Sequence, residues 1–195
     1  MKIVCIGDSL TYGFGVMKRH TWIEILKEKL EIRFVNKGIN GDTTAGMLSR
    51  SYEDIILNYP DKVIIMGGTN DFILGYDLKR VQENVIFLAK EANEHGIEPI
   101  IGIQIPTEPK LAREKWTKEV DYENVNKKIV DYRNRIIEAC KFNGYKYIDF
   151  YKEFVHELKD NGDCRYYTDG IHPNYEGHKI MARSAEKLIV SKTEK

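Results

Sequence analysis

The sequence predicts an α/β fold in which helices cover both faces of a five-stranded parallel sheet, which gives three layers. Short runs rich in β-branched residues alternate with longer segments of helical periodicity. The strand runs are almost continuously apolar, as is typical of parallel strands buried on both faces. The chain has 195 residues and shows no repeat or low-complexity linker. We therefore expect a single domain over residues 1–195.

The first half of the chain alternates three strands with two helices. The expected strands are short apolar runs at residues 2–6, 32–36 and 62–68. A helix is expected at 20–30, because apolar side chains at positions 22, 23, 26 and 30 form a helical stripe. A second helix is expected over 43–57, and Pro60 prevents its continuation.

The second half continues the alternation. Helices are expected at 77–96 and 124–144, and each ends at a glycine, the usual stop signal. The expected strands that follow them lie at residues 98–106 and 145–150. A last helix is expected to begin at Pro173, since proline is favoured in the first turn, and to run to about Val190.

One polar stretch, TEPKLAREKWTKEVDYE at 107–123, interrupts the step from the fourth strand to the next helix. It is strongly charged and carries Trp116. We expect this segment to form either a further helix or a lid.

Composition excludes several classes of partner. Thirty basic and 30 acidic residues give a formal net charge of zero, so nothing indicates binding to nucleic acid or to an anionic membrane. The apolar run before Gly7 is too short for a signal peptide, and no run reaches the length of a transmembrane helix. We expect a cytoplasmic protein without a membrane span. The sequence leaves the oligomeric state open, and a homodimer is compatible with it.

The three cysteines do not indicate a disulfide framework or a zinc site, because their number is odd and no C-x-x-C occurs. Cys5 and Cys140 lie in an expected strand and helix, where they serve as small core residues. Cys164 lies in an expected loop near the candidate site, and its role stays open. We expect no metal and no cofactor.

Several well-known motifs are missing. No G-x-G-x-x-G follows the first strand, and no phosphate-binding P-loop occurs. The G-x-S-x-G turn of the α/β-hydrolases and the H-E-x-x-H of zinc proteases are also absent.

Polar residues gather where a ligand site is expected, because open parallel sheets bind ligands beyond the carboxyl ends of their strands. Three segments follow the first three strands, and a fourth precedes the last helix: GDSLTYG with Ser9, NKGINGDTTAG with Gly41, GGTND with Asn70, and DGIHPN with Asp169 and His172. Taken alone, the first three segments are more often turns or helix caps, and the Asp/His segment is as often a surface loop. Their occurrence together at one sheet edge indicates a site.

The four segments, in this order, resemble the conserved blocks of the SGNH or GDSL family of esterases and acylhydrolases. The matches span residues 7 to 174, and no catalytic position departs from the family pattern. The resemblance implies a flavodoxin-like α/β/α sandwich. It also implies hydrolysis of carboxylic esters through an acyl-enzyme, without a metal or cofactor.

The resemblance assigns a role to each residue. Ser9 would be the nucleophile, His172 its general base, and Asp169 the carboxylate that orients the imidazole. The oxyanion hole would consist of the backbone N–H groups of Ser9 and Gly41 and the side-chain amide of Asn70.

Residues around these positions are expected to have supporting roles. Asp8 and Asp71 would brace their loops as hydrogen-bond acceptors, and Asp42, with Thr43 and Thr44, would cap the second helix. Next to Pro173, His172 would lie at a helix N-terminus, which disfavours the charged imidazole. Four other histidines are expected to be solvated or to cap helices: His20, His95, His156 and His178.

The substrate is expected to be a small-molecule or glycan ester with a short acyl chain. Tyr12, Phe72 and Trp116 are the candidate substrate-binding residues, since they lie next to the catalytic blocks or in the 107–123 segment. A lysophospholipase or thioesterase that acts on longer acyl chains is an alternative.

Two further alternatives come from different functional classes. The same fold with a disabled site could bind glycans or acyl groups without catalysis. A nucleotide-binding protein could use GDSLTYGFG as a phosphate loop, although no phosphate fingerprint supports this.

Overall fold

Five parallel strands form the central sheet of the computed structural model, which describes residues 1–161 and 165–190. They lie in the order β2-β1-β3-β4-β5. Their bounds are β1 (Lys2–Gly7), β2 (Arg33–Gly38), β3 (Lys62–Met66), β4 (Glu98–Ile103) and β5 (Lys146–Asp149). The predicted fold class is confirmed. From β1 the chain first adds β2 on one side and then adds β3 on the other side. Parallel sheets of this type bind ligands at the point where the strand order switches in this way, here between β1 and β3.

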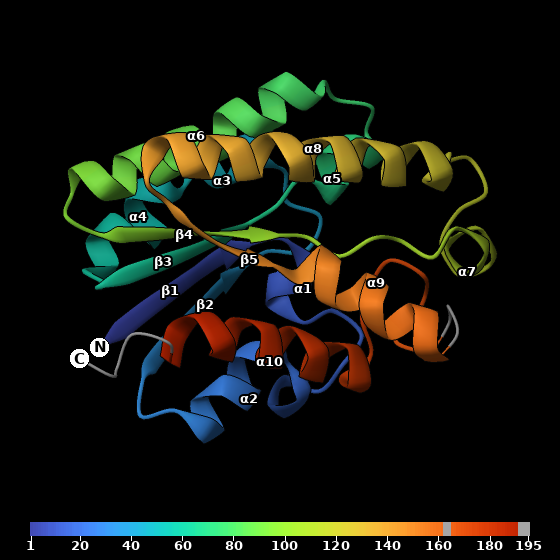
Figure 1. The fold of residues 1–195 in the computed structure, drawn as a ribbon, viewed down its shortest axis with the longest axis horizontal. Coiled ribbons are helices and arrows are strands. Elements are labelled where there is room, and N and C mark those ends of the chain that lie inside the picture. Colours follow the sequence, from blue (N-terminus) through green and yellow to red (C-terminus); the bar gives the residue numbers. More distant parts are fainter. Residues whose placement is uncertain (162–164, 191–195) are drawn as a thin grey trace.

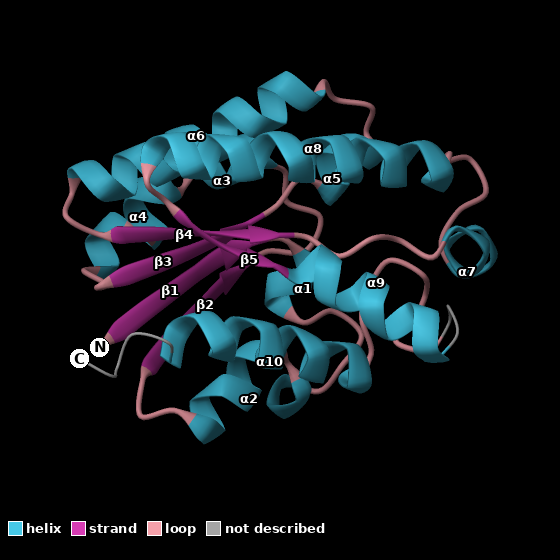
Figure 2. Cartoon of the chain, viewed as in Figure 1, coloured by secondary structure: helices cyan, strands magenta, loops and turns pink. Residues whose placement is uncertain are grey.

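Helices cover both faces of this sheet (Figures 1 and 2). One face carries α2 (Trp22–Lys29), α9 (Phe150–Asn161) and α10 (Tyr175–Val190), and the other carries α3 (Thr44–Ser49), α4 (Ser51–Asp54), α6 (Leu78–Glu94) and α8 (Tyr122–Asn143). Alternate strand residues supply the two cores. In β1, Ile3 and Cys5 belong to the core beside α2 and α10, whereas Val4 and Ile6 belong to the core beside α6 and α8. Burial on both sides explains the continuous apolar strand runs.

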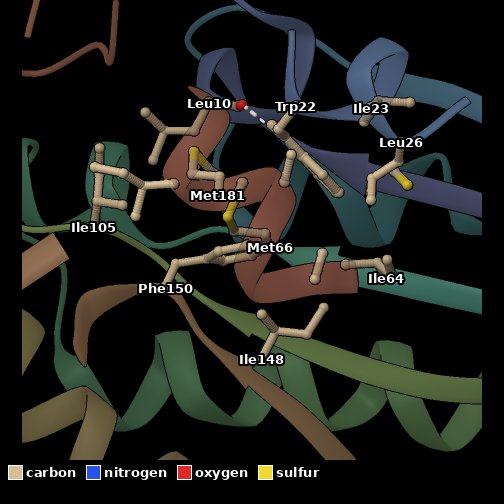
Figure 3. Packing of buried hydrophobic residues seen from close by; sticks show 14 of the residues in the cluster. Leu10, Trp22, Ile23, Leu26, Ile64, Met66, Ile105, Ile148, Phe150 and Met181 are labelled. Carbon is tan, nitrogen blue, oxygen red and sulfur yellow. Dashed lines mark hydrogen bonds between the residues drawn. The ribbon is translucent and has the colours of Figure 1, made fainter. Parts of the chain in front are cut away.

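Trp22 links the core to the short helix α1 (Ser9–Tyr12), as Figure 3 shows. Its indole is fully buried and packs near Phe150, with ring centroids 5.6 Å apart. The indole Nε1 donates to the Leu10 carbonyl at 3.1 Å. The start of α2 is therefore tied to the helix that carries Ser9.

Several short helices are absent from the sequence expectation. They are α1 and α5 (Thr69–Ile73), together with two 3-10 turns at Lys18–His20 and Ile56–Asn58, whereas α7 (Pro109–Lys115) lies in the segment expected to form a helix or a lid. Each spans two turns or fewer, which is too short to show an apolar stripe. The longer α9 follows β5 directly and was also not predicted.

Two expected helix boundaries are wrong. The helix expected over 43–57 breaks at Arg50, whose backbone (φ −118°, ψ 5°) leaves the helical region between α3 and α4. The last helix begins at Tyr175 and not at Pro173, because Pro173 forms an isolated bridge with Tyr167. His172 therefore does not adjoin the first turn of that helix.

Cys5 and Cys140 are fully buried core residues, and burial raises the pKa of both thiols. Cys164 lies outside the described residues. Within 1–161 and 165–190, no helix has the length and apolar composition needed to cross a bilayer.

Candidate active site

Ser9 is the first residue of α1, directly beyond the carboxyl end of β1. Asp8 caps this helix, because its Oδ1 accepts from the Leu10 N–H at 2.8 Å. Only glycine fits at position 7, since a β-carbon there would lie 2.2 Å from Thr11 Oγ1. The Ser9 N–H has no acceptor in the described part of the chain. It is thus available to a ligand.

Asp169 and His172 share one tight loop before α10. The Thr168 N–H donates to the His172 carbonyl at 2.8 Å and closes the loop. Asp169 Oδ1 accepts from the backbone N–H groups of Ile171 at 2.9 Å and His172 at 2.8 Å. This leaves Oδ2 of the carboxylate facing the imidazole.

The loop places the His172 ring between Asp169 and Ser9. Nδ1 lies 2.7 Å from Asp169 Oδ2, and Nε2 lies 2.9 Å from Ser9 Oγ. All three residues are buried, with 8%, 4% and 6% of Asp169, His172 and Ser9 exposed. A carboxylate beside Nδ1 favours the tautomer protonated there, which leaves Nε2 free to accept from the serine hydroxyl.

Asp169 is ionised at neutral pH. Burial by itself raises the pKa of this carboxyl, but hydrogen bonds from the His172 side chain and backbone and from the Ile171 N–H bring it below the ordinary value. The site therefore holds a fixed negative charge beside the imidazole, which stabilises the imidazolium when it forms.

Gly41 and Asn70 lie in the loops that follow β2 and β3. Gly41 adopts φ +76°, is exposed, and has no atom within 4 Å of where a β-carbon would be. Its N–H has no acceptor among the described residues. The Asn70 side chain donates one amide hydrogen to the Asp42 carbonyl at 2.9 Å. An amide group carries two hydrogens, so the second is available for a ligand.

Buried carboxylates brace these loops. Asp71 accepts from the Thr44 N–H at 3.0 Å and from the Thr44 hydroxyl at 2.7 Å, as predicted for a loop-bracing acceptor. Asp42 does not cap α3 as expected. The cap is Thr43, and the Asp42 carboxylate pairs with Arg50 at 2.8 Å. Sequence reasoning missed Arg50, since an arginine inside an expected helix is usually solvated.

Comparison with known proteins identifies the family of this chain. The model of the GDSL-like lipase/acylhydrolase family matches residues 5–180. The chain belongs to this family. A curated acetylxylan esterase from Geobacillus stearothermophilus is 28% identical and aligns with 94% of this chain and 91% of its own length. Esterase TesA of Pseudomonas aeruginosa is 31% identical over 53% of this chain and 55% of its own.

Solved structures agree with this assignment. A lipolytic protein of the G-D-S-L family from Veillonella parvula matches with a TM-score of 0.82 and 25% identity, over 99% of each chain. This GDSL-family protein is therefore a carboxylic ester hydrolase of the esterase/acylhydrolase type. The curated esterases among its relatives favour this activity over non-catalytic binding.

Two aromatic side chains of this GDSL-family protein cover His172. The Phe14 and Trp116 ring centroids lie 4.5 and 5.3 Å from the imidazole centroid and 5.9 Å from each other. Trp116 is 50% exposed and follows α7. The 107–123 segment contains this helix, and its buried Ala112 packs with Ile171 of the Asp/His loop.

The other two candidate substrate-binding residues have different surroundings. Tyr12 is 53% exposed and lines a groove of about 610 Å³ between α2 and β2. Phe72 is only 2% exposed, and its ring packs edge-to-face with Tyr132 at 5.9 Å. The expectation that Phe72 faces a substrate is therefore wrong: it lies in the core beside α6 and α8.

Among the other histidines, His178 meets the expectation of a capping group. His178 is fully buried, where its Nδ1 accepts from the Trp22 N–H at the start of α2. It is thus a capping group but not a solvated one, and burial lowers its pKa to about 3. Among the described residues, no three His, Cys, Asp or Glu side chains are grouped so as to ligate a metal ion.

Proposed function

We propose that this protein is a serine esterase in which Ser9, His172 and Asp169 act as a catalytic triad. The observation that carries the proposal is the position of His172, with Nε2 2.9 Å from the Ser9 hydroxyl and Nδ1 2.7 Å from a buried carboxylate. A serine hydroxyl is a weak nucleophile, so it needs a base at this distance.

In the first step, His172 Nε2 accepts the hydroxyl proton while Ser9 Oγ forms a bond to the carbonyl carbon of the ester. The carbonyl oxygen becomes an oxyanion. The imidazolium then donates its proton to the alkoxide oxygen as the carbon–oxygen bond breaks, and the alcohol leaves. Water attacks the acyl-enzyme with His172 again as base, which releases the carboxylic acid and regenerates Ser9.

Three donors support the oxyanion in this proposal. The Ser9 and Gly41 N–H groups have no acceptor within the described part of the chain, and Asn70 keeps one amide hydrogen free. Such donors act best when they are fixed before the reaction starts. The bracing by Asp8 and Asp71 supports this role.

We propose a short acyl chain and a polar or sugar-like alcohol. Half-exposed Trp116 lies beside His172 and offers a ring face to a sugar, and exposed Tyr12 lies on the same helix as Ser9. The relative named acetylxylan esterase supports the same choice. A series of p-nitrophenyl esters from acetyl to decanoyl, together with acetylated sugars and lysophospholipids, tests it. Faster turnover of the long-chain or lipid esters would contradict this substrate class.

The triad is tested by Ser9→Ala, with Ser49→Ala as the matched control. Ser49 is an exposed serine whose hydroxyl donates only to the local Gly46 carbonyl. We expect Ser9→Ala to lose at least about 10³-fold in kcat on p-nitrophenyl acetate with an unchanged melting temperature. Ser49→Ala should keep wild-type kinetics. Wild-type turnover by folded Ser9→Ala would exclude the proposal.

A further inference from the structure

Arg50 lies at the break between α3 and α4, and all three nitrogens of its guanidinium group donate hydrogen bonds. Nε donates to Asp42 Oδ2 at 2.8 Å, and Nη2 donates to the Gly7 carbonyl at 3.0 Å. Nη1 donates to the Lys37 carbonyl at 2.9 Å and to Asp54 Oδ2 at 2.5 Å. Only 14% of the side chain is exposed. An exposed ion pair makes fewer hydrogen bonds and holds its side chains less firmly than this group of contacts does.

Three of the four acceptors belong to the segments that build the site. Gly7 is the last residue of β1 and lies two positions before Ser9. Lys37 lies in β2, just before the loop that contains Gly41. Asp42 directly follows Gly41. A single side chain therefore connects the ends of two neighbouring strands to the loop that follows the second strand.

Asp42 in turn contacts Asn70. Its Oδ2 is held by Arg50, its Oδ1 accepts from the Thr43 N–H at 2.9 Å, and its carbonyl accepts from the Asn70 amide at 2.9 Å. Gly41 itself is exposed, and no atom lies within 4 Å of where its β-carbon would be. The Asp42 N–H closes the turn over residues 39–42 by donating to the Ile39 carbonyl at 3.2 Å, so the direction of the Gly41 N–H depends on how Asp42 is held.

We infer that Arg50 is a positioning residue that fixes the Gly41 N–H and the Asn70 amide in their reactive orientation. The inference rests on the proposed function, in which these two groups are oxyanion donors. Arg50 does not touch the substrate and acts through Asp42. Lysine cannot replace it fully, because one ammonium lacks the planar fork that reaches two carbonyls and two carboxylates together.

The kinetic test compares Arg50→Ala and Arg50→Lys with Arg133→Ala. Arg133 is a suitable control, because it is also part-buried and makes a double hydrogen bond to one carboxylate, that of Asp149 at the end of β5. Losing one oxyanion donor typically lowers kcat by 10²–10³, so we expect a fall of about 10²-fold for Arg50→Ala with little change in KM. Arg50→Lys should be intermediate, and Arg133→Ala close to wild type.

An inhibitor measurement separates orientation from general loosening. An alkylboronic acid forms a tetrahedral adduct with a serine and places an oxygen in the oxyanion position. Its inhibition constant should rise in Arg50→Ala by a factor similar to the loss in kcat. Equal kcat and inhibition constants in Arg50→Ala and Arg133→Ala, at a temperature where both are folded, would overturn the inference.

Hydrogen exchange tests the positioning without any esterase activity. Peptides that cover residues 39–46 should exchange faster in Arg50→Ala than in wild type or Arg133→Ala. Unchanged exchange there would overturn the inference even if Ser9 proved not to be a nucleophile. Faster exchange in a protein that never hydrolyses esters would instead refute the proposed function alone, and leave the positioning by Arg50 supported.

Discussion

Gly170 lies so close to α7 that a β-carbon at this position would stand 2.3 Å from the backbone nitrogen of Ala112. It lies between Asp169 and His172, adopts φ +88°, and its carbonyl accepts from the Glu108 N–H at 2.7 Å. The 107–123 segment thus packs directly on the loop that holds the histidine. The segment is therefore packed against the histidine loop along α7.

We predict that Gly170→Ala lowers kcat as well as stability, because the loop or α7 must shift to admit the methyl group. Gly96→Ala is the control, since Gly96 also has a positive φ but no atom within 4 Å of its β position. The control should lose only about 1–2 kcal/mol, the cost of a left-handed conformation. Urea denaturation and p-nitrophenyl acetate kinetics measure both effects. Equal kcat in the two variants would contradict this prediction.

Trp22→Phe should destabilise the fold by about 1–3 kcal/mol, because it leaves the buried Leu10 carbonyl without its indole donor and removes core volume. The change acts on α1, so kcat should also fall modestly. Urea denaturation monitored by far-UV circular dichroism measures the stability. The matched control is Trp116→Phe, an exposed tryptophan whose replacement should cost less than about 0.5 kcal/mol. Equal losses in both variants would argue against the hydrogen bond.

The sequence predicted the sheet from local patterns, and it grouped Ser9 with Asp169 and His172 through the resemblance to the GDSL family. Apolar runs such as 62–68 indicate strands whatever their partners, and Asp169 and His172 stand three residues apart in one loop. The role of Arg50 could not be predicted, since its acceptors at Gly7 and Lys37 are 43 and 13 residues away in the chain. Phe72 was misassigned for a related reason: its neighbour Tyr132 comes from α8, 60 residues later, and only the tertiary fold brings them together.

Trp116→Ala should change substrate recognition more than stability. The side chain is half exposed and its ring centroid lies 5.3 Å from that of His172, so its loss removes a ring face while leaving the hydrogen bond between His172 and Ser9 in place. We expect KM for acetylated sugars to rise several-fold, in line with about 1 kcal/mol for an aromatic contact, with kcat nearly constant. Exposed Phe142 is the control, because it lies at the far end of α8. An unchanged KM in Trp116→Ala would exclude sugar stacking on this ring.

Asp8 should make the stability of the protein depend on pH. The residue is fully buried, and within the described part of the chain its Oδ2 has no hydrogen-bond partner. Burial raises the pKa of Asp8 to about 7 against the opposing Leu10 hydrogen bond, and the nearby carboxylates of Asp71 and Asp42 add to this rise. The folded protein therefore retains this proton to a higher pH than the unfolded chain, in which an aspartate titrates near pH 4.

The sign follows from proton linkage. Between about pH 4 and pH 7 the folded state binds more protons at Asp8 than the unfolded state, so its contribution to the free energy of unfolding decreases as pH rises. Asp8→Asn keeps the Oδ1 acceptor for Leu10 but does not titrate. The variant should thus gain stability relative to wild type between pH 5 and pH 8. Urea denaturation at the two pH values measures this difference, and contributions from buried His178 cancel because both proteins contain it. If the free energy of unfolding changed with pH by the same amount in wild type and Asp8→Asn, Asp8 would not titrate in this range.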